Sequence, residues 1–335
     1  MNQPSKSLLM AALFVPILSP HVRGEAPMRH QAAHLLRSDS LTVEVMDPNL
    51  PERYNTGVRF SPVANVLRVV ADGRDFLFSP VPHQPQTDNC GLAMEFDVAS
   101  SMPPPGFAEA APGEGFLKIG VGVLRKAGEA YDFYKNYEPI ALAKSEATWN
   151  ADSAHFEQVC PAVNGYAYQL SADIRVEGKT LEVRYRLVNT GSRAFTTEQY
   201  THNFLTFGEA PVGAGYTVEF PRPVAVTGRY ASEYCTQNGI EFRAPFPPKV
   251  KAMNFIIAPI PGEIVESHLV ARDKSNGSSV KASVSLPPAR VVIHVSPRYL
   301  CPEQFVRIDL APGKAATWTR RFDFQIEMAT PAPAQ

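Results

Sequence analysis

Thr180-Leu-Glu-Val-Arg-Tyr-Arg-Leu-Val188 alternates apolar and charged side chains with a period of two. That period is typical of a β-strand with one face in the core and the other in solvent. Further segments rich in β-branched and aromatic residues recur along the chain, and turn signals such as Asn189-Thr-Gly191 separate them. No sustained 3.6-residue apolar period lies between them. The sequence therefore predicts an all-β fold, a large antiparallel β-sandwich with little helix.

Composition agrees with a globular protein that has a real core. The 335 residues are 44% hydrophobic and 19% charged, and the formal net charge of −1 offers no basic surface for nucleic acid or an anionic membrane. The 31 prolines are about 9% of the 335 residues, against an average near 5%. This proline content favours many short segments over long helices. We expect one domain over residues 38–327, followed by a disordered tail over residues 328–335.

The N-terminus has the pattern of a secretory signal peptide. Lys6 supplies a positive charge, residues 8–18 form an apolar run too short to span a bilayer, and small residues occur at Gly24 and Ala26. We expect a signal peptide over residues 1–26 and a periplasmic or secreted protein. No later stretch is long and apolar enough for a membrane span, so no membrane association beyond export is expected.

Four cysteines follow this segment: Cys90, Cys160, Cys235 and Cys301. None are close enough in sequence for a zinc knuckle or a Cys-x-x-Cys motif. Disulfides and buried thiols both remain open, with three possible pairings for the former. No phosphate-binding loop, nucleophile elbow or His-Glu-x-x-His motif occurs, so we expect neither a metal nor a cofactor.

Two segments about a hundred residues apart carry candidate acid–base groups. They are Tyr200-Thr-His-Asn-Phe204 and Tyr299-Leu-Cys-Pro-Glu303. A histidine among aromatics is more often structural, and a glutamate after Cys-Pro is often a solvated turn residue. His202 and Glu303 nevertheless have the chemistry for proton transfer to a small polar substrate.

Both segments resemble the catalytic segments of the aldose 1-epimerase (galactose mutarotase) superfamily. Cys301-Pro-Glu303 and the closing turn Leu310-Ala-Pro-Gly313 match one, and Tyr200-Thr-His-Asn-Phe204 matches the other. Tyr54-Asn-Thr-Gly-Val-Arg-Phe60 resembles the early Gly-x-Arg strand of the same superfamily. The resemblance implies a mutarotase-type sandwich that binds a small carbohydrate, with Glu303 as base, His202 as acid and Arg59 on sugar hydroxyls.

The resemblance extends to further candidate substrate contacts, namely Lys118, Tyr137, Tyr200 and Asn203. It implies an isomerase that interconverts anomers of a sugar or uronic acid, with an ionised Glu303 beside a protonated His202 in the resting enzyme. The chain departs from typical mutarotases in lacking a His-Gly pair ahead of His202. A polysaccharide lyase or hydrolase on the same fold, or a non-catalytic sugar-binding protein, therefore remains an alternative.

Overall fold

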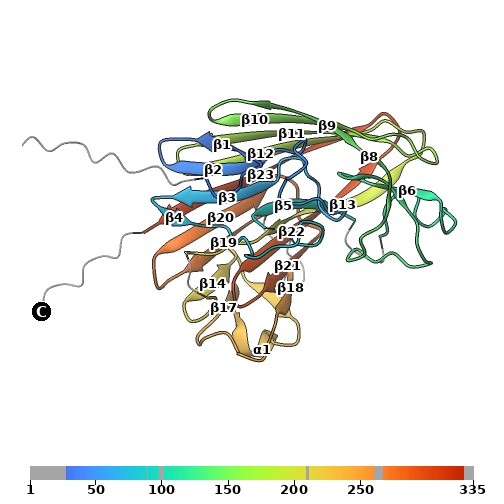
Figure 1. Cartoon of the computed structure of the whole chain (residues 1–335). Coiled ribbons are helices and arrows are strands. Elements are labelled where there is room, and N and C mark those ends of the chain that lie inside the picture. Colours follow the sequence, from blue (N-terminus) through green and yellow to red (C-terminus); the bar gives the residue numbers. More distant parts are fainter. Residues whose placement is uncertain (1–27, 89, 98–101, 209–210, 260–266, 328–335) are drawn as a thin grey trace, which may run out of the picture.

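The computed structural model describes residues 28–88, 90–97, 102–208, 211–259 and 267–327. The expected signal peptide, residues 1–26, and the expected tail, residues 328–335, lie outside the described residues. Within them 23 strands and one short helix, α1 (Ala231–Tyr234), form an all-β molecule (Figure 1). No helix in the described part of the chain has the length and apolar character needed to cross a membrane.

The first sheet has the strand order β1-β2-β3-β5-β13-β22-β21-β18-β15, with β4 paired to β3. Every pairing in it is antiparallel, as predicted. Its strands are β1 (Ala33–Arg37), β2 (Leu41–Met46), β3 (Val66–Ala71), β4 (Arg74–Asp75), β5 (Leu92–Phe96), β13 (Phe195–Asn203), β15 (Val224–Thr227), β18 (Met253–Pro259), β21 (Arg290–Val295) and β22 (Leu300–Leu310).

The second sheet is also antiparallel and has the order β16-β17-β14-β19-β20-β23-β12-β11-β10-β9. Its strands are β9 (Lys144–Trp149), β10 (Ser153–Val159), β11 (Tyr168–Glu177), β12 (Thr180–Asn189), β14 (Tyr216–Glu219), β16 (Cys235–Thr236), β17 (Gly239–Glu241), β19 (His268–Asp273), β20 (Ser278–Val284) and β23 (Ala315–Ile326). A third, three-stranded sheet, β6 (Gly115–Lys118), β7 (Gly122–Arg125) and β8 (Pro139–Leu142), lies at one end of the molecule, on the right in Figure 1.

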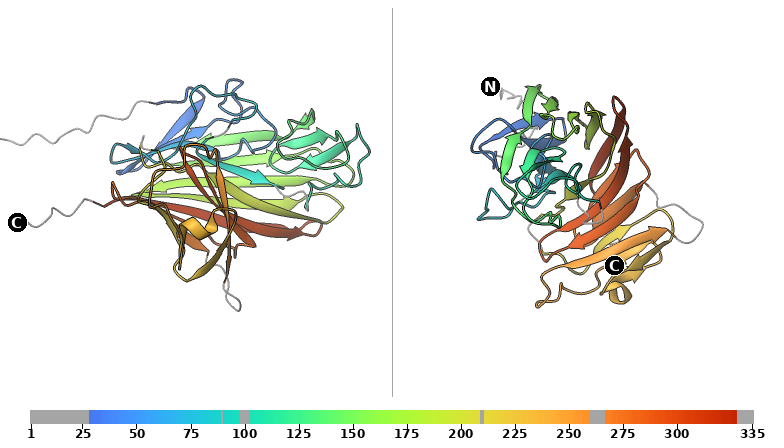
Figure 2. Two further views of the ribbon diagram at one scale, coloured as in Figure 1. Left: turned by 90° about the horizontal axis from the view of Figure 1, so that it is seen from below. Right: turned by 90° about the vertical axis from the view of Figure 1, so that its right-hand side faces the viewer.

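The two large sheets pack face to face, as the views in Figure 2 show, and the core lies between them. β12 confirms the alternation read from the sequence, because Leu181, Val183, Tyr185 and Leu187 are buried in that core. Aromatic contacts cross the interface: Phe96 of the first sheet and Trp318 of the second pack in a T-shaped arrangement, with ring centroids 6.3 Å apart. The predicted sandwich is thus confirmed.

The sandwich begins before residue 38, the expected domain start. β1 starts at Ala33 and pairs with β2, and the ring of His34 stacks on Trp149 of the second sheet at 3.9 Å. The sequence does not indicate β1, because this strand has only five residues and so gives a weak pattern. An edge strand needs just one partner, so such a short segment suffices.

Strands at the centre of the first sheet are buried on both faces. β13 alternates buried and half-buried residues as far as Gln199 and is then buried at every position to Asn203. β22 is buried at each position from Leu300 to Val306. One face of these segments meets the second sheet, while loops, among them those that carry Arg59, Phe78 and Phe133, cover the other. That covered outer face holds the candidate site.

A buried arginine supports these strands from the core side. Arg320 of β23 is 2% exposed, and its Nη2 donates to Gln199 Oε1 at 2.9 Å and to the carbonyl oxygen of Gln304 at 2.8 Å. Gln199 belongs to β13 and Gln304 to β22. The guanidinium therefore holds together, across the sandwich, the two strands that carry His202 and Glu303.

Replacing Arg320 with alanine is expected to lower the free energy of unfolding by about 3 kcal/mol, because it leaves a cavity and removes a donor from three buried acceptors, Gln199 Oε1 and the carbonyl oxygens of Gln199 and Gln304. Arg321→Ala is the matched control, since the neighbouring Arg321 is half-exposed and pairs with Asp323. The control should cost less than about 1 kcal/mol. Urea unfolding curves measure the free energy of unfolding of both variants, from the midpoints at an unchanged m-value. An equal loss of stability in Arg320→Ala and Arg321→Ala would contradict the role of Arg320.

Candidate active site

A cavity of about 530 Å³ opens on the outer face of the first sheet. Its floor comes from β13, β22, β21 and β18, and its rim comes from three loops and from the turn between β21 and β22, which carries Tyr299. The residues that line it are Arg59, Phe60, Phe78, Pro80, Thr87, Asp88, Phe133, Tyr134, Tyr200, His202, Phe204, Asn254, Arg290, Val292, His294, Tyr299, Glu303 and Phe305. The structure therefore brings His202, Glu303, Arg59 and Tyr200 together at one cavity.

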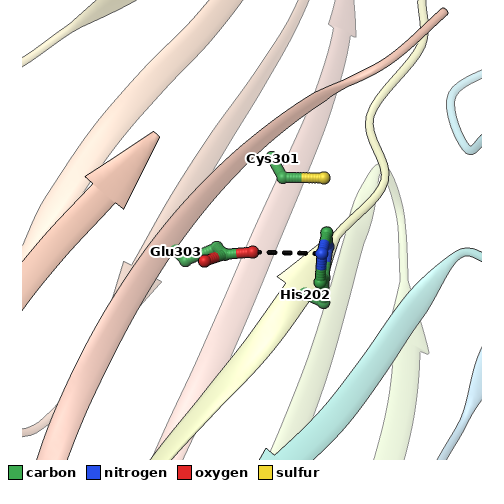
Figure 3. Close-up of side chains that lie close together, drawn as sticks. All are labelled: His202, Cys301 and Glu303. Carbon is green, nitrogen blue, oxygen red and sulfur yellow. Dashed lines mark ion pairs between the residues drawn. The ribbon is translucent and has the colours of Figure 1, made fainter. Parts of the chain in front are cut away.

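His202 and Glu303 face each other across the β13–β22 junction (Figure 3). His202 Nε2 lies 3.3 Å from Glu303 Oε1, and both side chains are at least nine-tenths buried. The register explains the meeting: the pairing ends with Gln199 opposite Val306, and three residues further along His202 stands opposite Glu303. An isolated bridge between Leu205 and Leu300 resumes the same register. The β13–β22 pairing is thus interrupted at the site and resumes beyond it.

Asn203 does not line the cavity, contrary to its expected role as a substrate contact. Successive strand residues point to opposite faces, so the neighbour of His202 points toward the second sheet. There its Nδ2 donates to the carbonyl oxygen of Pro302 at 2.7 Å. Proline has no backbone N–H for the ladder, and this side-chain bond links the strands where the regular pairing is interrupted. Asn203 is a structural residue of the junction.

Burial governs the electrostatics of the pair. It raises the pKa of Glu303 well above its usual range, against the opposing effect of Arg59. It also lowers the pKa of His202 well below its usual range, and Arg59 lowers it further. The expectation of a resting carboxylate beside an imidazolium is therefore corrected: the neutral pair, with the proton on Glu303, is favoured. Besides the proton on the far imidazole nitrogen, both forms hold one proton and differ only in its position between two atoms 3.3 Å apart.

Arg59 is held at the cavity by a buried carboxylate. Its Nε donates to Glu95 Oε2 at 2.9 Å, and its Nη2 donates to the hydroxyl oxygen of Tyr200 at 3.2 Å. The Tyr200 hydroxyl in turn donates to the same oxygen of Glu95 at 2.6 Å. Gly57 allows the loop this close approach, because a Cβ atom there would lie 2.2 Å from the carbonyl oxygen of Gln86. The Gly-x-Arg pattern thus has a steric reason.

Lys118 does not reach the cavity, contrary to its expected role. The side chain is 1% exposed, its ammonium donates to the carbonyl oxygen of Phe96, and it lies 3.9 Å from Glu95 Oε1. Lys118 therefore sits behind Glu95 as part of a buried charge cluster. This cluster also holds Asp97, whose Oδ1 accepts a hydrogen bond from Thr197 at 2.5 Å.

Tyr137 is also absent from the cavity lining. It is 3% exposed and packs edge-on against Phe116, with Tyr131 stacked beside it. Its hydroxyl accepts a hydrogen bond from the backbone N–H of Asp132. Tyr137 belongs to a small aromatic core that supports the 127–138 loop. The aromatic residues of that loop at the cavity are instead Phe133 and Tyr134, whose rings lie 4.9 Å and 5.0 Å from the Arg59 guanidinium carbon.

Sequence reasoning missed a second histidine at the site. His294 of β21 lines the cavity with its ring centroid 6.0 Å from that of His202, and its Nδ1 lies 2.8 Å from Asn254 Oδ1. An N–H donated to this amide oxygen leaves Nε2 as an acceptor. The signal was the alternation in residues 290–295: Val291, Ile293 and Val295 face the core, so His294 lies on the other face of the strand. Glu95, between the buried Met94 and Phe96, was a similar signal.

The four cysteines are free thiols: Cys90, Cys160 and Cys301 are buried, as one of the two alternatives expected, whereas Cys235 is exposed. Cys301 is buried beside the acid–base pair, on the same face of β22 as Glu303 (Figure 3). Its Sγ, an imidazole nitrogen of His202 and a carboxylate oxygen of Glu303 all lie within 4.8 Å of one another. Among the described residues this is the one cluster of three His, Cys, Asp or Glu side chains with metal-ligand spacing.

No protein-family model and no curated protein matches the sequence. Solved structures do match the fold. A Synechocystis sp. PCC 6803 protein superposes with a TM-score of 0.57 at 12% identity, covering 90% of this chain and 97% of that one. A putative aldose 1-epimerase from Escherichia coli K12 has a TM-score of 0.53 at 14% identity, covering 88% and 99%. A galactose mutarotase related enzyme from Lactobacillus acidophilus has a TM-score of 0.53 at 11% identity, covering 88% and 100%.

The chain has the galactose mutarotase-like fold. The structural neighbours confirm the fold that the sequence resemblance implied. At these identities they establish the architecture, and the activity has to be argued from the residues at the cavity.

The charge cluster behind Arg59 makes the stability of the galactose mutarotase-like fold dependent on pH. Burial raises the pKa of Asp97 to about 6, against the lowering effects of Lys118 and Thr197. A raised carboxyl pKa contributes stability that is fully present below the unfolded value, near 4, and is lost as pH rises through 6. Asn mimics the neutral form and tolerates the positive φ of 59° at this position.

Asp97→Asn should therefore gain stability over the wild type as pH rises from 4 to 7, by on the order of 2–3 kcal/mol. Unfolding free energies of both proteins at each pH measure the difference. Asp152→Asn, at an exposed turn, is the control and should follow the wild type. A difference between Asp97→Asn and the wild type that does not change with pH would contradict the assignment.

Proposed function

We propose that the protein is an aldose 1-epimerase-like isomerase that interconverts the anomers of a sugar or uronic acid. The observation that carries this proposal is the His202–Glu303 pair, one imidazole and one carboxyl group 3.3 Å apart on the floor of an open cavity. Neighbouring central strands hold both groups, so their separation is set by the register of the sheet. The fold and the matched motifs add support.

Mutarotation needs one group that accepts a proton and one that donates it. The ring opens when the O1 hydroxyl loses its proton and the ring oxygen O5 gains one; after rotation about C1–C2 the two transfers run in reverse. Each catalytic group therefore acts once as an acid and once as a base in every turnover. A pair that shares one transferable proton across 3.3 Å meets this need. Ring opening would start from the form in which that proton has moved from Glu303 to His202 Nε2: Glu303 then accepts the O1 proton while His202 donates its proton to O5, and closure reverses both transfers.

The cavity walls suit a sugar. Arg59 presents a planar guanidinium with donors for adjacent hydroxyls, and Glu95 fixes its orientation. Phe133 and Tyr134 line the cavity beside Arg59, and the exposed ring of Tyr134 would offer a surface for stacking of a pyranose ring. On the floor, His294 of β21 and Asn254 of β18 provide further polar groups. The volume of about 530 Å³ is in the usual range for small-ligand sites.

Glu303→Gln is expected to lower turnover by roughly 10²–10⁴-fold, because the amide keeps the shape but cannot carry the proton. His202→Asn should lose a similar factor, and the double variant little more than the worse single variant. The measurement is polarimetry on a panel of freshly dissolved α-anomers. Glu157→Gln, on β10 of the second sheet, is the matched control and should retain full activity.

The same experiment separates the alternatives. Near-wild-type turnover by Glu303→Gln would sink the acid–base assignment. An increase in absorbance from a new C=C bond with uronate polymers, without anomer exchange, would identify a lyase. Tight sugar binding without any turnover would identify a non-catalytic binding protein.

Tyr134→Ala should raise KM several-fold with little change in kcat, because the ring contacts the sugar face and takes no part in proton transfer. Tyr134 is 73% exposed, so the thermal midpoint should stay within about a degree or two. Tyr230→Ala is the control: it also removes a ring beside an arginine, Arg229, but does not line the cavity. An unchanged KM for Tyr134→Ala would exclude this stacking surface.

A further inference from the structure

The cluster of His202, Cys301 and Glu303 contains a residue that mutarotation does not use. Cys301 Sγ is buried on the same face of β22 as Glu303, and all three ligand atoms lie within 4.8 Å of one another. Glu303 makes no hydrogen bond to any described residue apart from its 3.3 Å approach to His202. A carboxyl group with 8% exposure and unused acceptor positions thus points at an imidazole and a thiol (Figure 3).

We propose that His202 Nε2, Cys301 Sγ and a Glu303 carboxylate oxygen form a three-ligand site for a thiophilic divalent cation, Zn²⁺, open toward the cavity. One imidazole, one thiolate and one carboxylate are ligand types that Zn²⁺ takes together, whereas Mg²⁺ and Ca²⁺ prefer oxygen alone. Three protein ligands leave the fourth position of a tetrahedral ion to water or a ligand.

The geometry needs little adjustment. Ligand atoms at about 2.0–2.3 Å from zinc in tetrahedral arrangement are roughly 3.3–3.7 Å apart. The His202–Glu303 separation of 3.3 Å already meets this range, and the remaining atoms have to approach by about 1 Å, which side-chain rotation supplies. The rigid positions on β13 and β22 limit the entropy lost on binding.

Charge balance favours a dication here. Zinc binding displaces the thiol proton of Cys301 and the single proton held by the His202–Glu303 pair, so two protons leave as one Zn²⁺ enters. The net charge of the buried cluster is unchanged, which avoids the cost of an added buried charge. His202 then carries its remaining proton on Nδ1. Since zinc occupies the two atoms that would exchange protons with a sugar, the bound metal inhibits the proposed isomerase.

The test measures metal binding directly, so its result does not depend on the proposed function. The full chain, reduced and freed of metal with a chelator, is titrated with Co²⁺, which substitutes for zinc and reports thiolate ligation by a near-ultraviolet charge-transfer band. We expect one equivalent of Co²⁺ to produce the band and Zn²⁺ to abolish it by displacement. Cys301→Ser should remove the band, and Cys235→Ser, which changes the exposed thiol, should retain it.

Glu303→Gln and His202→Asn provide a second measurement that leaves the thiol in place, and each should weaken Co²⁺ binding by at least roughly tenfold. Circular dichroism and thermal unfolding in metal-free buffer check that the variants fold. Absence of the band in the wild type, its persistence in Cys301→Ser, or its loss in Cys235→Ser would overturn the proposal. Retained metal binding by a catalytically intact Glu303→Gln would refute both proposals, whereas metal binding by a wild type that turns over no sugar would refute only the isomerase.

Discussion

The register of β13 against β22 is the constraint on which the candidate site depends. Counting along the two strands, Gln199 faces Val306, His202 faces Glu303, and Leu205 faces Leu300. A slip of one residue would turn His202 toward the second sheet and bring Asn203 to the cavity, because side chains alternate between faces. Two features of the core side oppose such a slip. Arg320 binds one residue of each strand, and Asn203 donates to the carbonyl of Pro302.

Burial on both faces gives the site its chemistry. In most of the second sheet the strands alternate between core and solvent, so a polar residue on the outer face is hydrated. At the centre of the first sheet the outer face is covered, and a histidine and a glutamate there lose most of their water. The low polarity raises the pKa of Glu303 and lowers the pKa of His202, so the neutral form of each is favoured. It also strengthens any interaction with a charge that develops during a reaction. The same covering layer supplies Arg59, Phe133 and Tyr134 as walls of the cavity.

The sequence supports the fold better than the details of the site. Period-two patterns such as that of 180–188 depend on local geometry alone, so they could be read before any contact was known. His202, Glu303 and Arg59 were recognisable from short motifs. Asn203 could have been excluded as a substrate contact once His202 was chosen, because neighbouring residues of a strand point to opposite faces. Lys118 and Tyr137 could not, because their burial depends on Glu95 and on Phe116, which pack against them from distant segments. The proton's resting place on Glu303 likewise follows from burial, which spacing does not reveal.

One physical property of the floor connects proton transfer with metal binding. The three side chains of the cluster lie in a buried setting that favours a neutral total, and any species that enters must either keep that total or bring its own counter-charge. A neutral sugar satisfies the condition, since the pair passes one proton out and takes one back. A dication satisfies it only if two protons leave, and Cys301 is the residue that supplies the second of them. With a serine at this position, whose hydroxyl does not ionise at neutral pH, proton exchange with a sugar would still balance and metal binding would not. The thiol therefore adds a second, competing use to a pair whose geometry already suits the first.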